Sequence, residues 1–259
     1  MSAPNAGWDP ALTRRSRRAF AIWGGLLVTF ALAWTSAWYG EDALGIPRFF
    51  RKGLSFNGLL WRGYSSNARE NHVPPVTGKA PRANGDVGLD AEGFEVAKWA
   101  MAVEMPGKPA LSLNMAALQW QPLAESSAEF RCIEGWSEPI SYAGVRFTDF
   151  LRHYNLGRRS GAPWGAETPT DLYEYVSLET PDGEYYVSID MESMLHAQTM
   201  LAWQMNGEPL SLENGAPLRL IIPQKYGIKN LKRIGKITFS DHRPPDYWAE
   251  RGYDWFAGL

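Results

Sequence analysis

The chain is poor in the residues that build most metal and covalent sites. Its 259 residues include one cysteine, Cys132, and four histidines. A single sulfur cannot form an intramolecular disulfide, so no disulfide indicates the redox compartment. No second cysteine and no His-x-His cluster is available to complete a zinc or iron–sulfur site. Cys132 is therefore either a buried apolar residue or a working thiolate.

The chain also lacks an excess of basic residues. Its formal net charge of −2 combines two unequal parts. The first 40 residues carry +3, and the remainder therefore carries −5. A mildly acidic main domain is a poor candidate for binding a phosphate backbone. We expect no nucleic-acid partner.

Charged residues are absent from 19 to 40, a segment rich in Trp, Leu, Ala and Phe. Its length is near the ~20 residues that cross a bilayer as a helix. Four arginines precede it, and Glu41 and Asp42 follow it. The positive-inside rule then places residues 1–18 in the cytoplasm and the main domain on the periplasmic side. We expect an inner-membrane protein that crosses the membrane once.

The arginines before this run have two interpretations. Residues 16–20 (SRRAF) resemble a twin-arginine export signal, a route that carries folded proteins. Alternatively, the arginines only set the topology. The apolar run is longer than the roughly 7–15 residues of an ordinary signal core, which favours an uncleaved anchor. Residues 35–37 would still be an acceptable small-residue cleavage site.

Composition divides the chain into four regions. These are a basic N-terminus (1–18), the transmembrane helix or signal (19–40), a juxtamembrane segment with an extended arm (41–93) and the main domain (94–259). The start of the third region is basic and aromatic (PRFFRK, 47–52), as expected beside lipid headgroups. Its later part is rich in Gly, Pro and Asn, which is typical of a linker.

The main domain mixes short strands and short helices. Alternation and apolar runs predict strands at 94–105, 129–133, 172–178, 184–189, 218–222 and 234–240. Helices are predicted at 113–120, with Trp120 on the apolar face, at 147–154 and within 191–204. Asp182-Gly183 predicts a hairpin turn. Because no regular βαβ alternation is present, the pattern favours an α+β fold, mixed and β-rich.

Four segments resemble one family. They read FRCIEGWS (130–137), YVSLET (175–180), NGAPLRLIIP (214–223) and KYGIKNLK (225–232). They are similar to segments of the sulfite-oxidase-type molybdopterin oxidoreductases, and most to the catalytic subunits of bacterial periplasmic methionine sulfoxide reductases. The resemblance covers most of residues 94–248. It implies a sulfite oxidase fold, here preceded by one transmembrane helix.

The resemblance implies a molybdenum–molybdopterin cofactor (Mo-MPT). The thiolate of Cys132 would be the one protein ligand to molybdenum, and the pterin dithiolene would supply further sulfur. The cofactor contacts of the family fall on Thr180, Asn214, Arg219, Asn230, Leu231 and Lys232. A phosphorylated pterin needs fixed cations and N–H donors. Lys229 would add a further cation to this group.

A segment upstream is similar to two cofactor motifs of the family. Residues 67–72 (NARENH) resemble both the Arg-Asn-His of the sulfite oxidases and the Asn-rich cofactor loop of the reductases, and match neither residue for residue. In the family an extended arm packs over the cofactor here. The candidate cofactor residues of this arm are Asn67, Arg69, Asn71 and His72. The alternative is an ordinary polar loop.

Two departures from the family leave the substrate open. The reductases carry a long insertion where residues 180–184 form a tight turn, so methionine sulfoxide cannot be carried over. The sulfite oxidases have an arginine-rich segment where residues 134–137 read EGWS, which makes sulfite less attractive. We therefore expect two-electron oxo transfer on a small or sulfur-containing substrate. Because no haem domain is apparent, the family points to a membrane b-type cytochrome as electron partner.

Other interpretations stay open at this point. Cys132 could be structural, since free cysteine is among the most buried residue types. A cysteine hydrolase would need His153 or His196 as a base, and neither has a recognisable spacing to Cys132. The chain could also be a cofactor-free, membrane-tethered binding or assembly domain of the same fold. We expect the aromatic tail to pack against the domain or the membrane rather than form a site: Tyr247, Trp248, Tyr253, Trp255 and Phe256.

Overall fold

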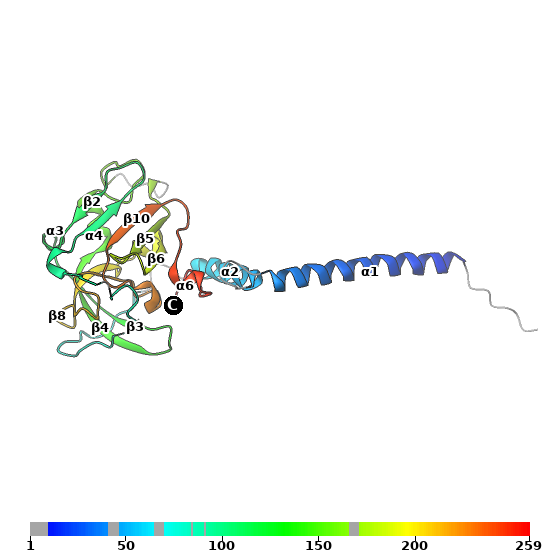
Figure 1. Cartoon of the computed structure of the whole chain (residues 1–259), viewed down its shortest axis with the longest axis horizontal. Coiled ribbons are helices and arrows are strands. Elements are labelled where there is room, and N and C mark those ends of the chain that lie inside the picture. The colour runs from blue at the N-terminus through cyan, green and yellow to red at the C-terminus, as the bar shows by residue number, and fades with distance from the viewer. Residues whose placement is uncertain (1–9, 41–46, 65–69, 84, 91, 166–170) are drawn as a thin grey trace, which may run out of the picture. The chain divides into compact units, whose positions relative to one another are not determined.

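The protein falls into two units in a computed structural model. The units are Met1–Gly53 and Leu54–Leu259, and each is described by itself (Figure 1). The structure describes residues 10–40, 47–64, 70–83, 85–90, 92–165 and 171–259.

The first unit consists mainly of helix α1 (Pro10–Tyr39). Within α1, Arg17–Ser36 has a mean hydropathy of 1.6 and none of it is buried, so by length and composition it can cross a membrane. A second helix, α2 (Arg48–Tyr64), starts beside the end of α1. The Arg48 N–H donates to the Gly40 carbonyl at 2.7 Å. The basic and aromatic composition of residues 47–52 predicts proximity to lipid. The helical structure of this segment is not predicted from the sequence.

The second unit contains two five-stranded sheets. The strands of the first sheet follow the order β2 (Leu111–Leu113), β1 (Met101–Glu104), β10 (Lys236–Ser240), β5 (Tyr175–Glu179) and β6 (Tyr186–Asp190). The second has the order β3 (Ala124–Arg131), β4 (Ser137–Arg146), β7 (Met200–Met205) and β8 (Glu208–Pro209), with β9 (Arg219–Ile221) also paired to β7. Among the described pairings, β1 with β10 is the parallel one. This mixed two-sheet architecture confirms the predicted α+β class.

Three short helices lie between strands, and a fourth follows the last strand: α3 (Met115–Gln119), α4 (Phe147–Tyr154), α5 (Met191–Met194) and α6 (Tyr247–Glu250). The predicted helix at 147–154 is confirmed. The predicted face of the helix at 113–120 is wrong, because β2 continues to Leu113 and the Asn114 side chain caps α3 by accepting from the Ala117 N–H at 3.0 Å. This later start turns Leu118 inward and leaves Trp120 84% exposed.

Strand β7 was predicted as part of a helical segment, and this prediction is wrong. Leu201 and Trp203 pack into the larger core, whereas Met200, Ala202 and Met205 pack into a smaller core on the other face. A strand covered on both faces is apolar along its length and shows no alternation. Such a run cannot be told from a buried helix by periodicity. The smaller core also contains Cys132.

The arm before the main domain is ordered along the second sheet. The Val73 N–H donates to the Ser127 carbonyl at 3.3 Å, and the Val76 N–H donates to the Ser141 hydroxyl at 2.7 Å. Further along, Gly88 adopts φ +75°, and a Cβ at this position would lie 2.6 Å from the Thr180 side chain. A glycine here therefore lets the arm reach the end of β5.

The C-terminal tail is held to the domain by a buried ion pair. The Lys229 ammonium lies 2.5 Å from an Asp246 carboxylate oxygen and donates to the Ser188 carbonyl at 3.1 Å. The other Asp246 oxygen accepts from the Ala249 N–H at 3.0 Å and so caps α6. Burial lowers the pKa of Lys229, and Asp246 opposes this shift. The pair therefore fixes where the tail starts.

Removing one partner of this pair should be costly. We expect Lys229→Met to lower the free energy of unfolding by about 3–5 kcal/mol, because the Asp246 carboxylate stays buried without a cation. Lys229→Met combined with Asp246→Asn, which keeps the cap, should recover most of this loss. Urea denaturation of both variants provides the measurement. Equal destabilisation of the single and the double variant would contradict the ion-pair role.

Candidate functional site

Cys132 opens the turn between β3 and β4. Its N–H donates to the Trp136 carbonyl at 2.9 Å, and the Gly135 N–H donates back to the Cys132 carbonyl at 3.1 Å. The side chain of Cys132 is buried. Its neighbour Arg131 points to solvent and pairs with Glu129 at 2.8 Å, as alternation along a strand requires. The turn therefore presents the thiol to the interior and the preceding guanidinium to water.

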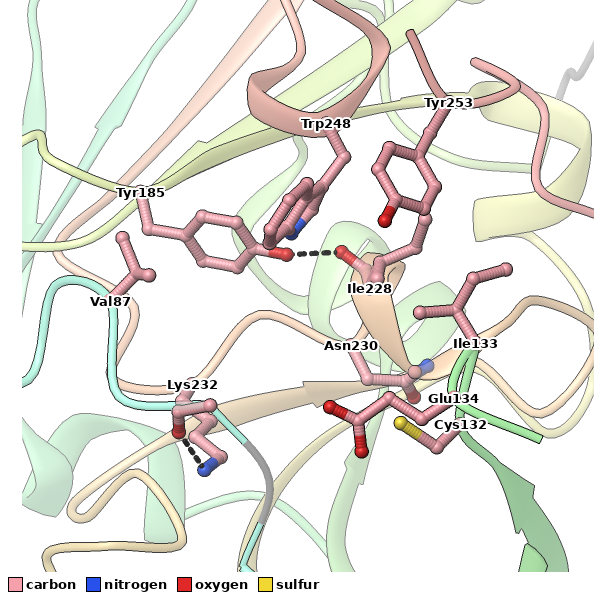
Figure 2. A pocket seen from close by; sticks show the side chains of 12 residues that line it. Val87, Cys132, Ile133, Glu134, Tyr185, Ile228, Asn230, Lys232, Trp248 and Tyr253 are labelled. Atoms are coloured by element: carbon pink, nitrogen blue, oxygen red, sulfur yellow. Dashed lines mark hydrogen bonds between the residues drawn. The ribbon is translucent and has the colours of Figure 1, made fainter. Parts of the chain in front are cut away.

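A cavity of about 170 Å³ lies beside the thiol (Figure 2). Its walls come from five distant segments, namely the arm, the Cys132 turn, the start of β6, residues 227–232 and the C-terminal tail. Figure 2 shows Trp248 and Tyr253 on the opposite side of the cavity from Cys132 and Glu134. The lining residues are Gly85, Val87, Cys132, Ile133, Glu134, Tyr185, Gly227, Ile228, Asn230, Lys232, Trp248 and Tyr253.

A buried guanidinium lies behind the Asn230 wall of the cavity. Arg219 is 2% exposed, and its terminal nitrogens donate to the Asn214 carbonyl at 3.1 Å and the Asn230 carbonyl at 3.4 Å. Its Nε and the Asn214 Oδ1 are buried and have no hydrogen-bond partner in the described part of the chain. Burial lowers the pKa of Arg219. A buried cation without a carboxylate partner is a natural site for an anion.

Lys232 is a second cation at this wall. Its ammonium donates to the Gly85 carbonyl of the arm at 2.8 Å. Burial, together with the nearby Arg219 charge, lowers the pKa of Lys232 to about 8. Gly215, at φ +94°, allows the close approach, because a Cβ there would lie 2.7 Å from the Lys232 Cβ. The Arg219 charge thus opposes that of Lys232, and Asp86 and Glu213 partly offset this effect.

The structure brings together part of the predicted set. Cys132, Asn230 and Lys232 line the cavity, and Asn214 and Arg219 adjoin its Asn230 wall. The Asn230 amide is fixed, because its Oδ1 accepts from the Ile222 N–H at 2.8 Å.

Other predicted residues have different surroundings. Leu231 is a fully buried core residue whose carbonyl accepts from the Leu220 N–H at 2.8 Å. Thr180 holds the β5–β6 turn by accepting from the Tyr185 N–H at 3.1 Å. Lys229 pairs with Asp246, as described above.

The upstream candidates lie along β3. The Asn71 side chain donates to the Glu129 carbonyl at 3.3 Å, and the exposed His72 contacts Glu70. Neither residue lines the cavity. Asn67 and Arg69 lie outside the described residues.

The aromatic tail corrects the sequence-based expectation. Trp255 and Phe256 pack inward, as expected, whereas Trp248 and Tyr253 line the cavity. Their rings contact each other edge to face, with centroids 5.1 Å apart. Glu134 and Tyr185 were also missed as lining residues. Only the clustering of aromatics at the end of the sequence could have pointed to the tail.

The competing site chemistries find no support in this geometry. The ring of His196 is buried and accepts from the Gln198 N–H at 3.1 Å, and His153 lies on the exposed face of α4. Neither histidine lines the cavity with Cys132, so within the described residues no histidine base accompanies the thiol. Within the described ranges, no three His, Cys, Asp or Glu side chains gather as a metal site.

These residues fit an anionic, sulfur-bearing metal cofactor. A buried thiol lines the cavity. A buried guanidinium with an unused N–H lies behind the Asn230 wall, next to an unused amide oxygen of Asn214. Residues 88–248 match the family described as oxidoreductase molybdopterin binding domain. The chain belongs to this family. Its enzyme class, sulfite oxidase-like fold and molybdopterin cofactor are thereby confirmed as predicted.

Curated relatives carry related names. The chain is 36% identical over 137 residues to the putative protein-methionine-sulfoxide reductase subunit YedZ1 of Azospira oryzae, covering 53% of this chain and 47% of the relative. It is 29% identical over 185 residues to the protein-methionine-sulfoxide reductase catalytic subunit MsrP of Campylobacter jejuni, covering 65% and 59%. The chain thus spans about half the length of the relatives that it matches.

A solved structure is also similar to this chain. The sulfane dehydrogenase SoxCD from Paracoccus pantotrophus is 17% identical, with a TM-score of 0.48, and the match covers 70% of this chain and 53% of that one.

The lowered pKa of Lys232 predicts a pH dependence. The folded, cofactor-free protein should release this proton near pH 8, whereas the unfolded chain keeps it to about 10.5. Between these values the unfolded state binds more protons, so the free energy of unfolding should rise with pH. The Lys232→Met variant should lack this part of the rise in denaturant titrations from pH 7 to 10.5. Identical pH profiles for both proteins would contradict it, and the exposed Lys98→Met is the control.

Proposed function

We propose that this chain is a membrane-anchored, molybdopterin-dependent oxidoreductase that carries out two-electron oxo transfer on a small, uncharged or cationic oxide. One observation carries the proposal. The buried thiol of Cys132 lines the cavity together with Asn230, and the Asn230 carbonyl accepts from the guanidinium of Arg219, which has no carboxylate partner among the described ion pairs. A cofactor with sulfur ligands to its metal at one end and a phosphate at the other matches this pair.

We assign the cofactor-binding residues by the donor and acceptor atoms that remain available on their side chains. Cys132 would supply the thiolate ligand, since thiolates suit soft or high-valent metals. Arg219 and Lys232 would hold the phosphate end, because each offers N–H donors close to the cavity. Asn214 would accept a hydrogen bond from the pterin through its unused oxygen.

The remaining predicted residues would not contact the cofactor themselves but would position the segments that surround it. Thr180 would position the arm through Gly88, and Leu231 would hold the backbone between Asn230 and Lys232. Lys229 would position the tail. Asn71 would anchor the arm upstream of Gly85 through its hydrogen bond to the Glu129 carbonyl.

When bound, molybdopterin supplies the two-electron oxo-transfer chemistry, and the protein binds, orients and tunes it. The chain itself would exclude water and define the entrance. Tyr185 would contribute to the exclusion of water, because its buried hydroxyl donates to the Ile228 carbonyl at 2.6 Å. The same burial raises the pKa of this hydroxyl. Trp248 and Tyr253 would cover the substrate side of the cavity.

The charge of the cavity would select the substrate. Glu134 lines it near the thiol, and the Trp136 indole N–H holds its carboxylate at 3.0 Å. A fixed negative charge disfavours anions such as sulfite, and aromatic rings attract cationic groups. The relatives are named methionine sulfoxide reductases, which favours oxidised sulfur as the reacting group. The short 180–184 turn leaves open which sulfoxide is used.

Residues 17–36 would anchor the enzyme in the inner membrane, with the second unit on the periplasmic side. The apolar length of α1 supports the anchor, and the four arginines near its start support this orientation. Electrons would come from a membrane b-type cytochrome. An anchor keeps such a partner close, and this chain shows one site for a redox cofactor in its described residues.

Loss of the buried guanidinium should release the cofactor. We expect protein from a molybdenum-replete native host to hold about one molybdenum and one pterin per chain, from one thiolate ligand and one phosphate site. Arg219→Met should lose most of both, because the phosphate loses its buried charge. Cys132→Ser should keep the pterin and lose oxo-transfer activity. Elemental analysis and pterin fluorescence provide the measurements.

Arg131→Met is the matched control, since Arg131 is an exposed arginine beside the thiol. It should keep molybdenum and pterin. Folded wild-type protein without either would overturn the proposed function and favour a cofactor-free binding domain.

Charge selection at Glu134 can be tested with paired substrates. We expect Glu134→Gln to raise kcat/KM for an anionic sulfoxide, methylsulfinylacetate, over neutral dimethyl sulfoxide by about three- to tenfold at low salt. The effect should shrink as salt screens the charge. Glu184→Gln, in the exposed β5–β6 turn, is the control. An unchanged ratio of the two kcat/KM values would show that Glu134 does not select charge.

A further inference from the structure

Helix α2 separates its aromatic and basic residues onto two faces. At 3.6 residues per turn, Phe49, Phe56 and Leu60 share one face, which Phe50 and Leu54 extend. The described basic side chains occupy the opposite face: Arg48, Arg51 and Lys52. An aromatic face opposite a basic face is the pattern of helices that lie in a membrane interface.

The aromatic face is open to its surroundings. Phe49 and Phe50 are each 51% exposed, Phe56 is 62% exposed and Leu60 is 57% exposed. Residues 48–64 contain no Asp or Glu. A face with several large exposed apolar residues marks a binding surface. The neighbouring cluster of basic residues restricts the partner to one with negative charge.

The start of α2 has a defined depth relative to α1. The Gly40 N–H donates to the Ser36 carbonyl at 3.0 Å, so helical spacing continues to Gly40. Gly40 in turn accepts from the Arg48 N–H. Gly40 lies four residues beyond the apolar stretch that ends at Ser36, which is about 6 Å along a helix. A distance of this size from the hydrocarbon edge corresponds to the headgroup layer.

We propose that α2 lies along the membrane interface, with its aromatic face in the acyl boundary and its basic residues among the phosphates of anionic phospholipids. The inference rests on the proposed membrane span of α1 and is independent of the oxo-transfer chemistry. Lipid is favoured over a protein partner because the start of α2 lies at headgroup depth. At this depth acyl chains are directly beside the exposed aromatic face.

Hydrogen exchange of the full-length holoenzyme tests the proposal. The protein is placed in nanodiscs of phosphatidylcholine alone, in nanodiscs with about one-third phosphatidylglycerol, and in detergent. We expect the α2 amides to exchange at least about tenfold more slowly in the phosphatidylglycerol discs than in the neutral discs. Amides of α1 should be protected in both kinds of disc.

Two variants separate the two faces. Arg48→Glu with Arg51→Glu and Lys52→Glu should abolish the difference between anionic and neutral discs. Phe49→Ser with Phe56→Ser should remove α2 protection in both. Arg48→Lys with Arg51→Lys keeps the charge and should behave like the wild type. All of these variants should keep the oxo-transfer activity of the holoenzyme in detergent, because none of the substituted residues lines the cavity beside Cys132.

Two outcomes would overturn the proposal. Equal α2 exchange in neutral and anionic discs would exclude binding to anionic lipid. Protection of α2 in non-ionic detergent equal to that in the anionic discs would show that it docks on protein instead, including the acidic main domain. Unprotected α1 amides in discs would instead overturn the proposed membrane span. Absence of molybdenum from the wild-type protein would overturn the proposed enzyme function. The three failures therefore give different experimental results.

Discussion

The cost of burying a cation organises the C-terminal part of this protein. A buried ammonium or guanidinium is costly unless negative charge compensates it. Lys225 meets Asp190 at 3.4 Å, and Lys229 meets Asp246. Arg219, equally buried, has backbone carbonyl and Met205 sulfur contacts but no carboxylate among the described ion pairs. Lys225 and Lys229 therefore stabilise the fold through carboxylate partners, whereas the charge of Arg219 is available to a ligand.

This division explains how the cavity is built. The compensated pair of Lys229 and Asp246 holds the tail, which carries Trp248 and Tyr253 to one side of the cavity. Arg219 and Lys232 adjoin the other side. An anion bound there would compensate the buried charge of Arg219. Cofactor binding and stability are therefore linked, since any ligand specific for the native state stabilises it. The cofactor-free protein should be the less stable form for this physical reason.

Local motifs made part of the site predictable. Cys132, Asn230 and Lys232 fall in contiguous segments whose order and spacing resemble the family, and they meet at one cavity. The role of Lys229 could not be predicted, because its partner Asp246 comes from a tail whose path depends on tertiary packing. Strand β7 was misjudged for a related reason, since burial on both faces removes the alternation that marks a strand. Trp248 and Val87 line the cavity only because the tail and the arm close over it.

A single membrane-spanning helix fixes the depth of an attached enzyme but leaves it free to rotate and tilt. A second helix along the interface, starting from the end of the first, would remove much of that freedom. Restricting orientation raises the effective concentration of an active site only toward partners in the same membrane. A soluble electron partner would gain nothing from it. An α2 helix placed as we propose would therefore favour a membrane-resident redox partner, independently of any resemblance to other proteins.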